Sequence, residues 1–291
     1  MGPDPDLVRV GSTDGVSLAV HDLGGTGDPL LLAHATGFHG HVLEPLAHRV
    51  ADTFHAYAVD LRAHGDSTAP VNDRFEWPSL GDDVLAAVDA LGLTGAFALG
   101  HSGGGAAVVL AEAARPGTFA GLYLVEPVIF PYESADDLAG FDNPLARGAL
   151  KRRERFGSLA EAYANYDGKG AFTDFTTESL HAYVDHGFEA DPEGGVRLKC
   201  HPVHEAAYYR MAASSGAYTR LADVTCPVTL VHGGPNGHFT PEVFAAQCER
   251  LPVARVEPHL ELGHFAPMED PDAIAASLRR AWEWTRGHAR D

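Results

Sequence analysis

The chain has 291 residues, of which 45% are hydrophobic and 21% charged, as in a globular protein that buries a large core. It carries 21 Lys and Arg against 40 Asp and Glu, and this formal charge of −19 argues against binding to nucleic acid or to an anionic membrane surface. Three widely spaced cysteines, Cys200, Cys226 and Cys248, predict neither a disulfide framework nor a C-x-x-C metal site.

The pattern of apolar residues predicts neither a signal peptide nor a membrane-spanning segment. The first residues, Met1–Asp6, are acidic and lack an apolar stretch, so we expect no signal peptide. No apolar run approaches the ~18–20 residues that a membrane span needs. We therefore expect a cytoplasmic protein that acts on a small-molecule substrate, without nucleic-acid or membrane partners.

The first half of the chain alternates between predicted strands and helices. Leu7–Val10 and Val16–Val20 predict a β-hairpin around the turn Thr13–Gly15. Short apolar runs then predict buried strands, and amphipathic segments predict helices. In chain order these are the strands Leu30–Ala33 and Phe54–Val59, the helix Ser79–Leu91 with Ser79 as N-cap, the strand Phe97–Leu99, the helix Gly105–Ala114 and the strand Gly121–Val125.

The same alternation returns near the end of the chain. It comprises the strand Val228–Val231, the helix Pro241–Leu251 with Thr240 as N-cap, the strand Ala254–Val256 and the helix Pro271–Thr285. Strands that alternate with helices on this scale predict an α/β fold, in which a mostly parallel sheet is covered by helices on both faces.

The segment from about Phe130 to Leu221 breaks this pattern. Its buried-strand runs stop, and it is rich in aromatic, histidine and charged residues with mainly helical patterning. We interpret residues 131–221 as a helical cap inserted into a core made of residues 1–130 and 222–291. Within the cap, the basic run Lys151–Arg155 is interpreted as a solvated helix face.

A glycine-rich turn separates the predicted strand Phe97–Leu99 from the helix that follows, and it reads Gly100-His101-Ser102-Gly103-Gly104. A G-x-S-x-G run between a strand and a helix is typical of a nucleophile elbow, which exposes the serine Oγ. Such a turn brings backbone segments close together, so Gly100 and Gly104 must lack a Cβ. The alternative is a glycine-rich turn with an incidental serine.

Four segments in chain order resemble the motifs of the α/β-hydrolase family. His34–Phe38 is similar to the H-G-x-x-G oxyanion loop, although Ala35 stands where glycine is usual. Asp60–Ser67 is similar to the D-x-R-G-x-G-x-S block, the elbow follows, and Leu262–Phe265 is similar to the segment that carries the catalytic histidine. The resemblance covers nearly the whole chain except the cap.

This resemblance implies an α/β-hydrolase fold, a doubly wound sheet with an inserted cap, and it assigns roles to individual residues. Ser102 is expected to be the nucleophile and His264 its base, because a serine hydroxyl needs a base within hydrogen-bond reach. The backbone N–H groups of Thr36 and Gly103 are expected to form the oxyanion hole. The helix start after Ser102 favours a developing negative charge at the same place.

The motifs do not identify which residue supplies the carboxylate that orients His264. In most of the family an aspartate follows the strand predicted at Val228–Val231, and the corresponding residue here is Asn236, which cannot balance an imidazolium charge. We favour Glu126, which ends an apolar strand at the edge of the sheet that the elbow also faces. Some branches of the family, such as haloalkane dehalogenase-like enzymes, carry their acid there. The alternatives are Asn236 alone, an unidentified acid, or a solvated Glu126.

Further residues are candidates for lining the pocket or for binding a metal. His101, at the variable position of the elbow, is expected to shape the pocket wall, and His34, Phe38 and Tyr132 are further pocket candidates. The pairs His39 with His41 and His232 with His238 have loosely ligand-like spacing. Because we find no neighbouring set of Asp, Glu or Cys to complete either pair, the sequence predicts no metal site and no cofactor.

The function predicted from the sequence is that of a serine hydrolase. It would cleave a small or medium, largely apolar ester, lactone or thioester through an acyl-enzyme. The dehalogenase reaction does not carry over, because an alkyl-enzyme ester needs a carboxylate at the elbow. Two alternatives stay open: a C–C bond hydrolase of diketone-type substrates, and a non-hydrolytic ligand-binding protein on the same fold, which the missing acid at Asn236 motivates. The sequence leaves the substrate and the oligomeric state open.

Overall fold

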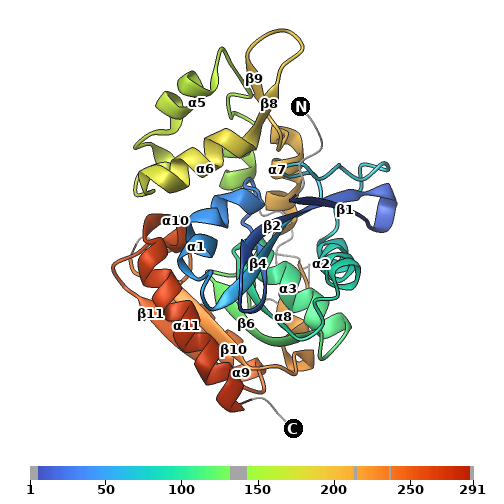
Figure 1. Cartoon of the computed structure of the whole chain (residues 1–291), viewed down its shortest axis with the longest axis vertical. Coiled ribbons are helices and arrows are strands. Elements are labelled where there is room, and N and C mark those ends of the chain that lie inside the picture. The colour runs from blue at the N-terminus through green and yellow to red at the C-terminus, as the bar shows by residue number, and fades with distance from the viewer. Residues whose placement is uncertain (1–5, 132–142, 213–214, 236, 289–291) are drawn as a thin grey trace.

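An eight-stranded sheet forms the centre of the molecule (Figure 1). The computed structural model describes residues 6–131, 143–212, 215–235 and 237–288. The order of the strands across the sheet is β1-β2-β4-β3-β5-β6-β10-β11. Their bounds are β1 Leu7–Gly11, β2 Ser17–Gly25, β3 Asp28–Ala33, β4 Phe54–Asp60, β5 Ala96–His101, β6 Phe119–Val125, β10 Val228–Gly233 and β11 Ala254–His259.

Six of the strands run parallel, and the two at the β1 edge run antiparallel to their neighbours. This arrangement confirms the predicted hairpin and the predicted mostly parallel sheet. Strand β5 lies between β3 and β6, so the residues at its carboxyl end stand between the loops that leave those two strands. That position places Ser102, directly after β5, at the middle of the sheet edge.

Helices cover both faces of the sheet, and each face has its own apolar core. On one face lie α2 (Trp77–Leu91), α3 (Gly103–Ala114) and α9 (Pro241–Arg250). On the other face lie α1 (Glu44–Arg49) and α11 (Pro271–His288), which Figure 1 shows at the left of the sheet. Every residue of β5 is buried, which explains why this strand appears in the sequence as a continuous apolar run.

Helix boundaries are where the sequence prediction was least accurate. Helix α2 begins at Trp77 rather than after an N-cap at Ser79, because Pro78 occupies the first turn, where its fixed φ suits a helix. Thr240 does stand at the N-cap of α9, although its side chain makes no capping hydrogen bond. Helix α1 was not predicted, since its 6 residues are too few to show a helical period.

The described residues between β6 and β10 form five α-helices, which Figure 1 shows gathered mainly at the top of the molecule. They are α4 (Pro144–Ala149), α5 (Leu159–Tyr166), α6 (Thr177–Gly187), α7 (Pro202–Met211) and α8 (Ala217–Arg220). The mainly helical character matches the prediction. A small antiparallel sheet of β7 (Arg155–Phe156), β9 (Val196–Leu198) and β8 (Phe188–Ala190) was missed, because strands this short show no alternation. We call residues 143–221 the inserted segment.

The basic run Lys151–Arg155 was predicted to be a solvated helix face; Lys151, Arg153 and Arg155 are exposed, but the run is not helical and Arg152 is not solvated. It follows α4 as a turn and enters β7. The Arg152 side chain is only 18% exposed and pairs with Glu205, with 2.5 Å between Nη1 and Oε2. Arg152 also donates hydrogen bonds to the hydroxyls of Tyr166 and Tyr183. A buried carboxylate and two phenols thus replace water around this guanidinium, and no local sequence pattern shows that replacement.

The Asp60–Ser67 block is a buried anchor for the loops around the sheet edge. The Asp60 carboxylate accepts hydrogen bonds from the N–H groups of Gly40, at 2.6 Å, and Asp66, at 2.7 Å. Arg62 is fully buried and forms a two-pronged ion pair with Asp83, each contact 2.7 Å long. The block therefore fixes the loop after β3, which carries the predicted oxyanion residue.

No helix in the described part of the chain has both the length and the apolar character that a bilayer crossing requires.

Candidate active site

Ser102 lies in a strained turn between β5 and α3. Its φ of 53° is in a region that residues with a Cβ rarely adopt. A Cβ on Gly104 would lie 2.2 Å from the carbonyl oxygen of Ala33, and one on Gly100 would lie 2.6 Å from the Cα of Gly105. Both distances are far too short for real atoms, so the prediction that these two glycines must lack a Cβ is confirmed. Ser102 is 6% exposed.

Thr36 and Gly103, the predicted oxyanion pair, lie beside each other. A Cβ built on Gly103 would stand 3.4 Å from the backbone nitrogen of Thr36 and 2.6 Å from its hydroxyl. Gly103 is the first residue of α3, so its N–H has no acceptor within the helix. The loop that carries Thr36 is tied to the same helix, because the N–H of Gly104 donates to the carbonyl of His34 at 3.0 Å.

His264 and Glu126 are brought together from positions 138 residues apart. His264 follows β11 and Glu126 follows β6, and 3.3 Å separates His264 Nδ1 from Glu126 Oε2. Glu126 is fully buried, and its carboxylate also accepts hydrogen bonds from the N–H groups of Gly233, at 2.8 Å, and His238, at 2.9 Å. Because two backbone donors hold this carboxylate, its position and its negative charge are stabilised within the protein.

Two further residues hold the backbone of His264, and neither role was predicted. Nε2 of His101 donates to the carbonyl of His264 at 2.8 Å. The Glu269 carboxylate accepts from the N–H groups on either side, those of Gly263 at 2.5 Å and Phe265 at 3.0 Å. The main chain around His264 is therefore fastened on both sides. Motif matching missed Glu269 because it lies outside the resembling segment, five residues beyond His264.

His238 contacts His264, and the sequence did not indicate this contact. Its ring stacks on that of His264, with centroids 3.9 Å apart and planes inclined by 13°. Burial, and secondly the neighbouring His238, lowers the pKa of His264 well below the usual value. The imidazole of His264 is thus neutral at physiological pH, which is the form that accepts a proton. With 17 histidines in the chain, no local signal marks this one.

The pocket candidates have different surroundings. His34 is fully buried, and its Nε2 accepts from the N–H of Leu61 at 3.0 Å. Phe38 contacts Phe265, which follows His264, with ring centroids 5.4 Å apart. Phe38 also contacts three aromatic rings of the inserted segment: Phe172, Phe175 and Tyr183. Tyr132 and Asn236 lie outside the described residues.

One pocket adjoins the candidate site through the loop after β10. It has a volume of about 630 Å³ and is lined by the end of β10, the loop that follows it, the first residue of α9 and Leu260. His238 and Phe239 are among the lining residues, and His238 is also the residue stacked on His264. The pocket therefore reaches the neighbourhood of His264 from the side of His238.

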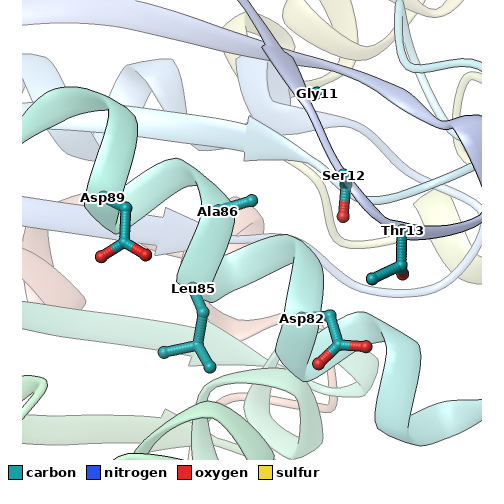
Figure 2. Close-up of a pocket in the computed structure, with 7 residues that line it drawn as sticks. All are labelled: Gly11, Ser12, Thr13, Asp82, Leu85, Ala86 and Asp89. Atoms are coloured by element: carbon teal, nitrogen blue, oxygen red, sulfur yellow. The ribbon is translucent and has the colours of Figure 1, made fainter.

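A second pocket lies away from the predicted residues, between the end of β1 and helix α2, with a volume of about 420 Å³. Figure 2 shows Asp82 and Asp89 on the helix, with Ser12 and Thr13 on the chain that faces it. None of the predicted site residues lines this pocket. The site built around Ser102 is accordingly the stronger functional candidate.

Comparison with known proteins shows the family of this chain. A model described as the alpha/beta hydrolase family matches residues 30–277. The chain is 26% identical to the magnesium-chelatase 30 kDa subunit of Rhodobacter capsulatus, over 90% of this chain and 88% of the relative. It is 23% identical to esterase YbfF of Escherichia coli (strain K12), over 87% of this chain and 92% of the relative. The crystal structure of E-2-(acetamidomethylene)succinate hydrolase matches with a TM-score of 0.77 and 21% identity, covering 95% of this chain and 99% of that one.

Proposed function

Because this chain belongs to the alpha/beta hydrolase family and is a hydrolase, we propose that it is a serine hydrolase that cleaves a small or medium, largely apolar ester, lactone or thioester. The observation that carries this proposal is the buried contact of Glu126 with His264, beside the strained turn at Ser102. A nucleophile, a base and a carboxylate that orients the base are the parts that acyl transfer requires.

The proposed reaction proceeds in two halves. Nε2 of His264 takes the proton of the Ser102 hydroxyl while Oγ attacks the substrate carbonyl carbon. The N–H groups of Thr36 and Gly103 stabilise the resulting oxyanion. The intermediate then expels the alcohol or thiol, which receives the proton from His264, and leaves an acyl-enzyme. Water, deprotonated by the same imidazole, attacks the acyl group and regenerates Ser102.

Glu126 supplies two properties that the base needs in this mechanism. Its Oε2 accepts the Nδ1–H of His264, so that Nε2 is left free to take a proton. Its negative charge stabilises the imidazolium that forms in each half-reaction. The two backbone hydrogen bonds to the carboxylate keep it in place without cancelling that charge.

An apolar substrate is supported by the aromatic cluster formed by Phe38, Phe265 and the inserted segment's Phe172, Phe175 and Tyr183. These rings connect the loop after β3 to the residue that follows His264. We propose that the inserted segment acts as a cap over Ser102 and that these rings contribute the apolar wall of the pocket. Replacing water near the reacting carbonyl with apolar groups strengthens the hydrogen bonds to the oxyanion.

The test is covalent labelling by a fluorophosphonate together with hydrolysis of short-chain p-nitrophenyl esters. The wild-type protein is expected to be labelled at Ser102 and to turn over the esters, whereas Ser102→Ala loses labelling and at least about 10³-fold of kcat. Ser277→Ala is a matched control, because Ser277 is buried and hydrogen-bonded to Tyr123 outside the site. No labelling of the wild type, or equal labelling of Ser102→Ala, contradicts the proposal.

A second candidate function is non-hydrolytic ligand binding on the same fold. The observation that favours it is that Ser102 makes no side-chain hydrogen bond to His264 in the described part of the chain. Such contacts often tighten only when substrate binds, so this geometry is also compatible with catalysis. Ligand binding without turnover of any ester or diketone favours this second function, and diketone cleavage favours the C–C hydrolase.

A further inference from the structure

Three side chains with metal-binding atoms meet where the inserted segment contacts the core. His41 comes from the 3₁₀ helix Gly40–Leu43, Glu44 begins α1, and His186 lies in the last turn of α6. Their ligand atoms all lie within 4.8 Å of one another. Oε2 of Glu44 is 3.3 Å from His41 Nδ1 and 3.9 Å from His186 Nε2. The spacing of His39 and His41 was noted from the sequence, but no local pattern indicates His186 as a partner, because it is 145 residues from His41.

The two histidines are arranged so that their nitrogens face the same carboxylate. Their rings stack with centroids 3.8 Å apart and planes inclined by 15°. The other carboxylate oxygen of Glu44, Oε1, lies 3.6 Å from Nε2 of His48. Glu44 thus presents one oxygen to His41 and His186, while the second faces a neighbour that orients the carboxylate.

The chain segments that carry these ligands are independently fixed. Nε2 of His39 donates to the carbonyl of Tyr183 in α6, one turn before His186, at 3.1 Å. The N–H of Gly40 donates to Asp60 at 2.6 Å. The loop is therefore fastened to α6 on one side and to the sheet on the other, which holds the ligands in register before any ion binds. His39 is not a ligand in this arrangement, because its Nε2 is used for the contact with α6.

Two imidazole nitrogens and one carboxylate oxygen form a donor set that Zn²⁺ and its neighbours in the first transition series prefer. In a tetrahedral complex with bonds of about 2.0–2.1 Å, the ligand atoms lie about 3.3–3.4 Å apart. The distance of 3.3 Å already fits, whereas the His186 ring must turn out of the stack and bring Nε2 closer than 3.9 Å, because a bound ion lies in the plane of each imidazole that holds it. All three side chains are partly exposed, so water can occupy the remaining position.

We propose that His41, Glu44 and His186 bind a divalent transition-metal ion of the Zn²⁺ class, which links helix α6 of the inserted segment to the loop after β3. Binding replaces the hydrogen bond between His41 Nδ1 and Glu44 with bonds from both groups to the metal, and the ring proton of the neutral imidazole moves from Nδ1 to Nε2. The proposal does not depend on the serine hydrolase mechanism, because none of the three ligands belongs to the candidate active site.

A second group of donors, His21, Asp60 and Asp66, is also close together but does not form a comparable site. Both oxygens of Asp60 are already used, one by the N–H of Gly40 and the other by His21 and the N–H of Asp66. Asp66 pairs with Lys199 at 2.9 Å. An ion there would have to displace these contacts, whereas an ion at His41, Glu44 and His186 displaces the hydrogen bond between His41 and Glu44.

The first experiment titrates chelator-stripped, full-length protein with ZnCl₂ in a calorimeter and with CoCl₂ in a spectrophotometer. We expect one ion per chain, the visible absorption of four-coordinate Co²⁺, and a rise in Tm of roughly 4–8 °C at Zn²⁺ concentrations about 100 times the Kd. The Tm readout is independent of enzymatic activity. No 1:1 binding of Zn²⁺ at protein and metal concentrations of about 100 µM overturns the proposal.

Variants then locate the ion. His186→Ala and Glu44→Gln are expected to weaken Zn²⁺ binding at least about 10-fold and to abolish the rise in Tm. His181→Ala is the matched control, since His181 lies on the same helix, is 56% exposed and, among the described residues, contacts Asp185 and the ring of Tyr163 rather than the proposed ligands. The metal-free Tm of each variant shows whether it is folded. If His186→Ala is folded and binds Zn²⁺ as tightly as the wild type, the site is not the one proposed.

Discussion

The ring of His238 lies parallel to the ring of His264 at a centroid distance of 3.9 Å, while the backbone N–H of His238 donates to Glu126. One residue therefore contacts both the proposed base and its carboxylate partner. The titratable side chains that contact His264 in the described part of the chain are Glu126, which follows β6, His101 from β5 and His238 from the loop after β10. A positive charge on either neighbouring histidine would oppose protonation of His264.

Replacing His238 with phenylalanine keeps a flat ring on His264 and removes the titratable group. Because His238 lowers the pKa of His264, we expect this pKa to rise and the acid limb of the kcat/KM profile to move to higher pH. A pH–rate profile measures the shift. His288→Phe, at the far end of α11, should leave the profile unchanged. An acid limb that stays in place, or moves to lower pH, in the His238→Phe protein would refute this role.

Glu126→Gln is expected to lower kcat by about 10²–10⁴-fold, since an amide cannot stabilise the imidazolium of His264. Glu112→Gln is the control, because Glu112 is equally buried and also accepts two backbone N–H groups, from Gly117 and Phe119, outside the site. This control should lose stability and keep kcat. Steady-state kinetics and urea unfolding separate the two effects. If Glu126→Gln loses stability but retains kcat, Glu126 is a structural carboxylate.

Gly104→Ala is expected to destabilise the protein by about 3 kcal/mol or more, because its Cβ would lie 2.2 Å from a backbone oxygen that has little room to move. Gly148→Ala, in α4, is the matched substitution, since no described atom beyond its chain neighbours and its own helix backbone lies within 4 Å of the new methyl group. That variant should be neutral or slightly more stable. Thermal unfolding compares the two. A Gly104→Ala protein with the wild-type Tm contradicts the tight packing of the elbow.

Three buried histidines make the protein sensitive to acid. Burial lowers the pKa of His34, His39 and His101 to about 3 each. Between this value and the unfolded pKa of about 6.5, the unfolded chain binds more protons, so stability is lost as the pH falls through that window. Near pH 5.5 these three groups contribute a slope of about 4 kcal/mol per pH unit.

Urea unfolding at a series of pH values from 7 to 5 measures this slope. His39→Asn should reduce it by about 1.4 kcal/mol per pH unit, the contribution of one proton. The exposed His48, at 62% side-chain exposure, provides the control, and His48→Asn should leave the slope unchanged. A slope that is the same in His39→Asn and in the wild type shows that His39 is already protonated in the folded protein at these pH values.

The sequence was informative wherever a feature depends on neighbouring residues. Apolar runs identified the parallel strands because those strands are buried on both faces. The glycines around Ser102 indicated the elbow, since a turn this tight excludes a Cβ at Gly100 and Gly104. Boundaries were less accurate where two local signals competed, as at the start of α2, where Pro78 outweighs the capping preference of Ser79.

Contacts between distant segments required the tertiary structure. Glu126 was chosen from its place at a strand end, but its distance of 3.3 Å from His264 depends on how two loops meet at the sheet edge. Arg152 was placed in solvent because its neighbours in sequence are charged, whereas its partner Glu205 lies in α7. The packing of distant segments against one another decides such pairings, and the spacing of residues along the sequence does not indicate them.

The sequence by itself determined the α/β alternation, the elbow at Ser102 and the order of the family motifs, because each depends on local backbone geometry or on periodic burial. Only the tertiary structure decided that His238 stacks on His264 and that His41 and His186 face the same carboxylate. This difference arises because local geometry is set by a residue and its immediate neighbours, whereas side-chain clusters form where the packing of the whole chain holds separate segments together.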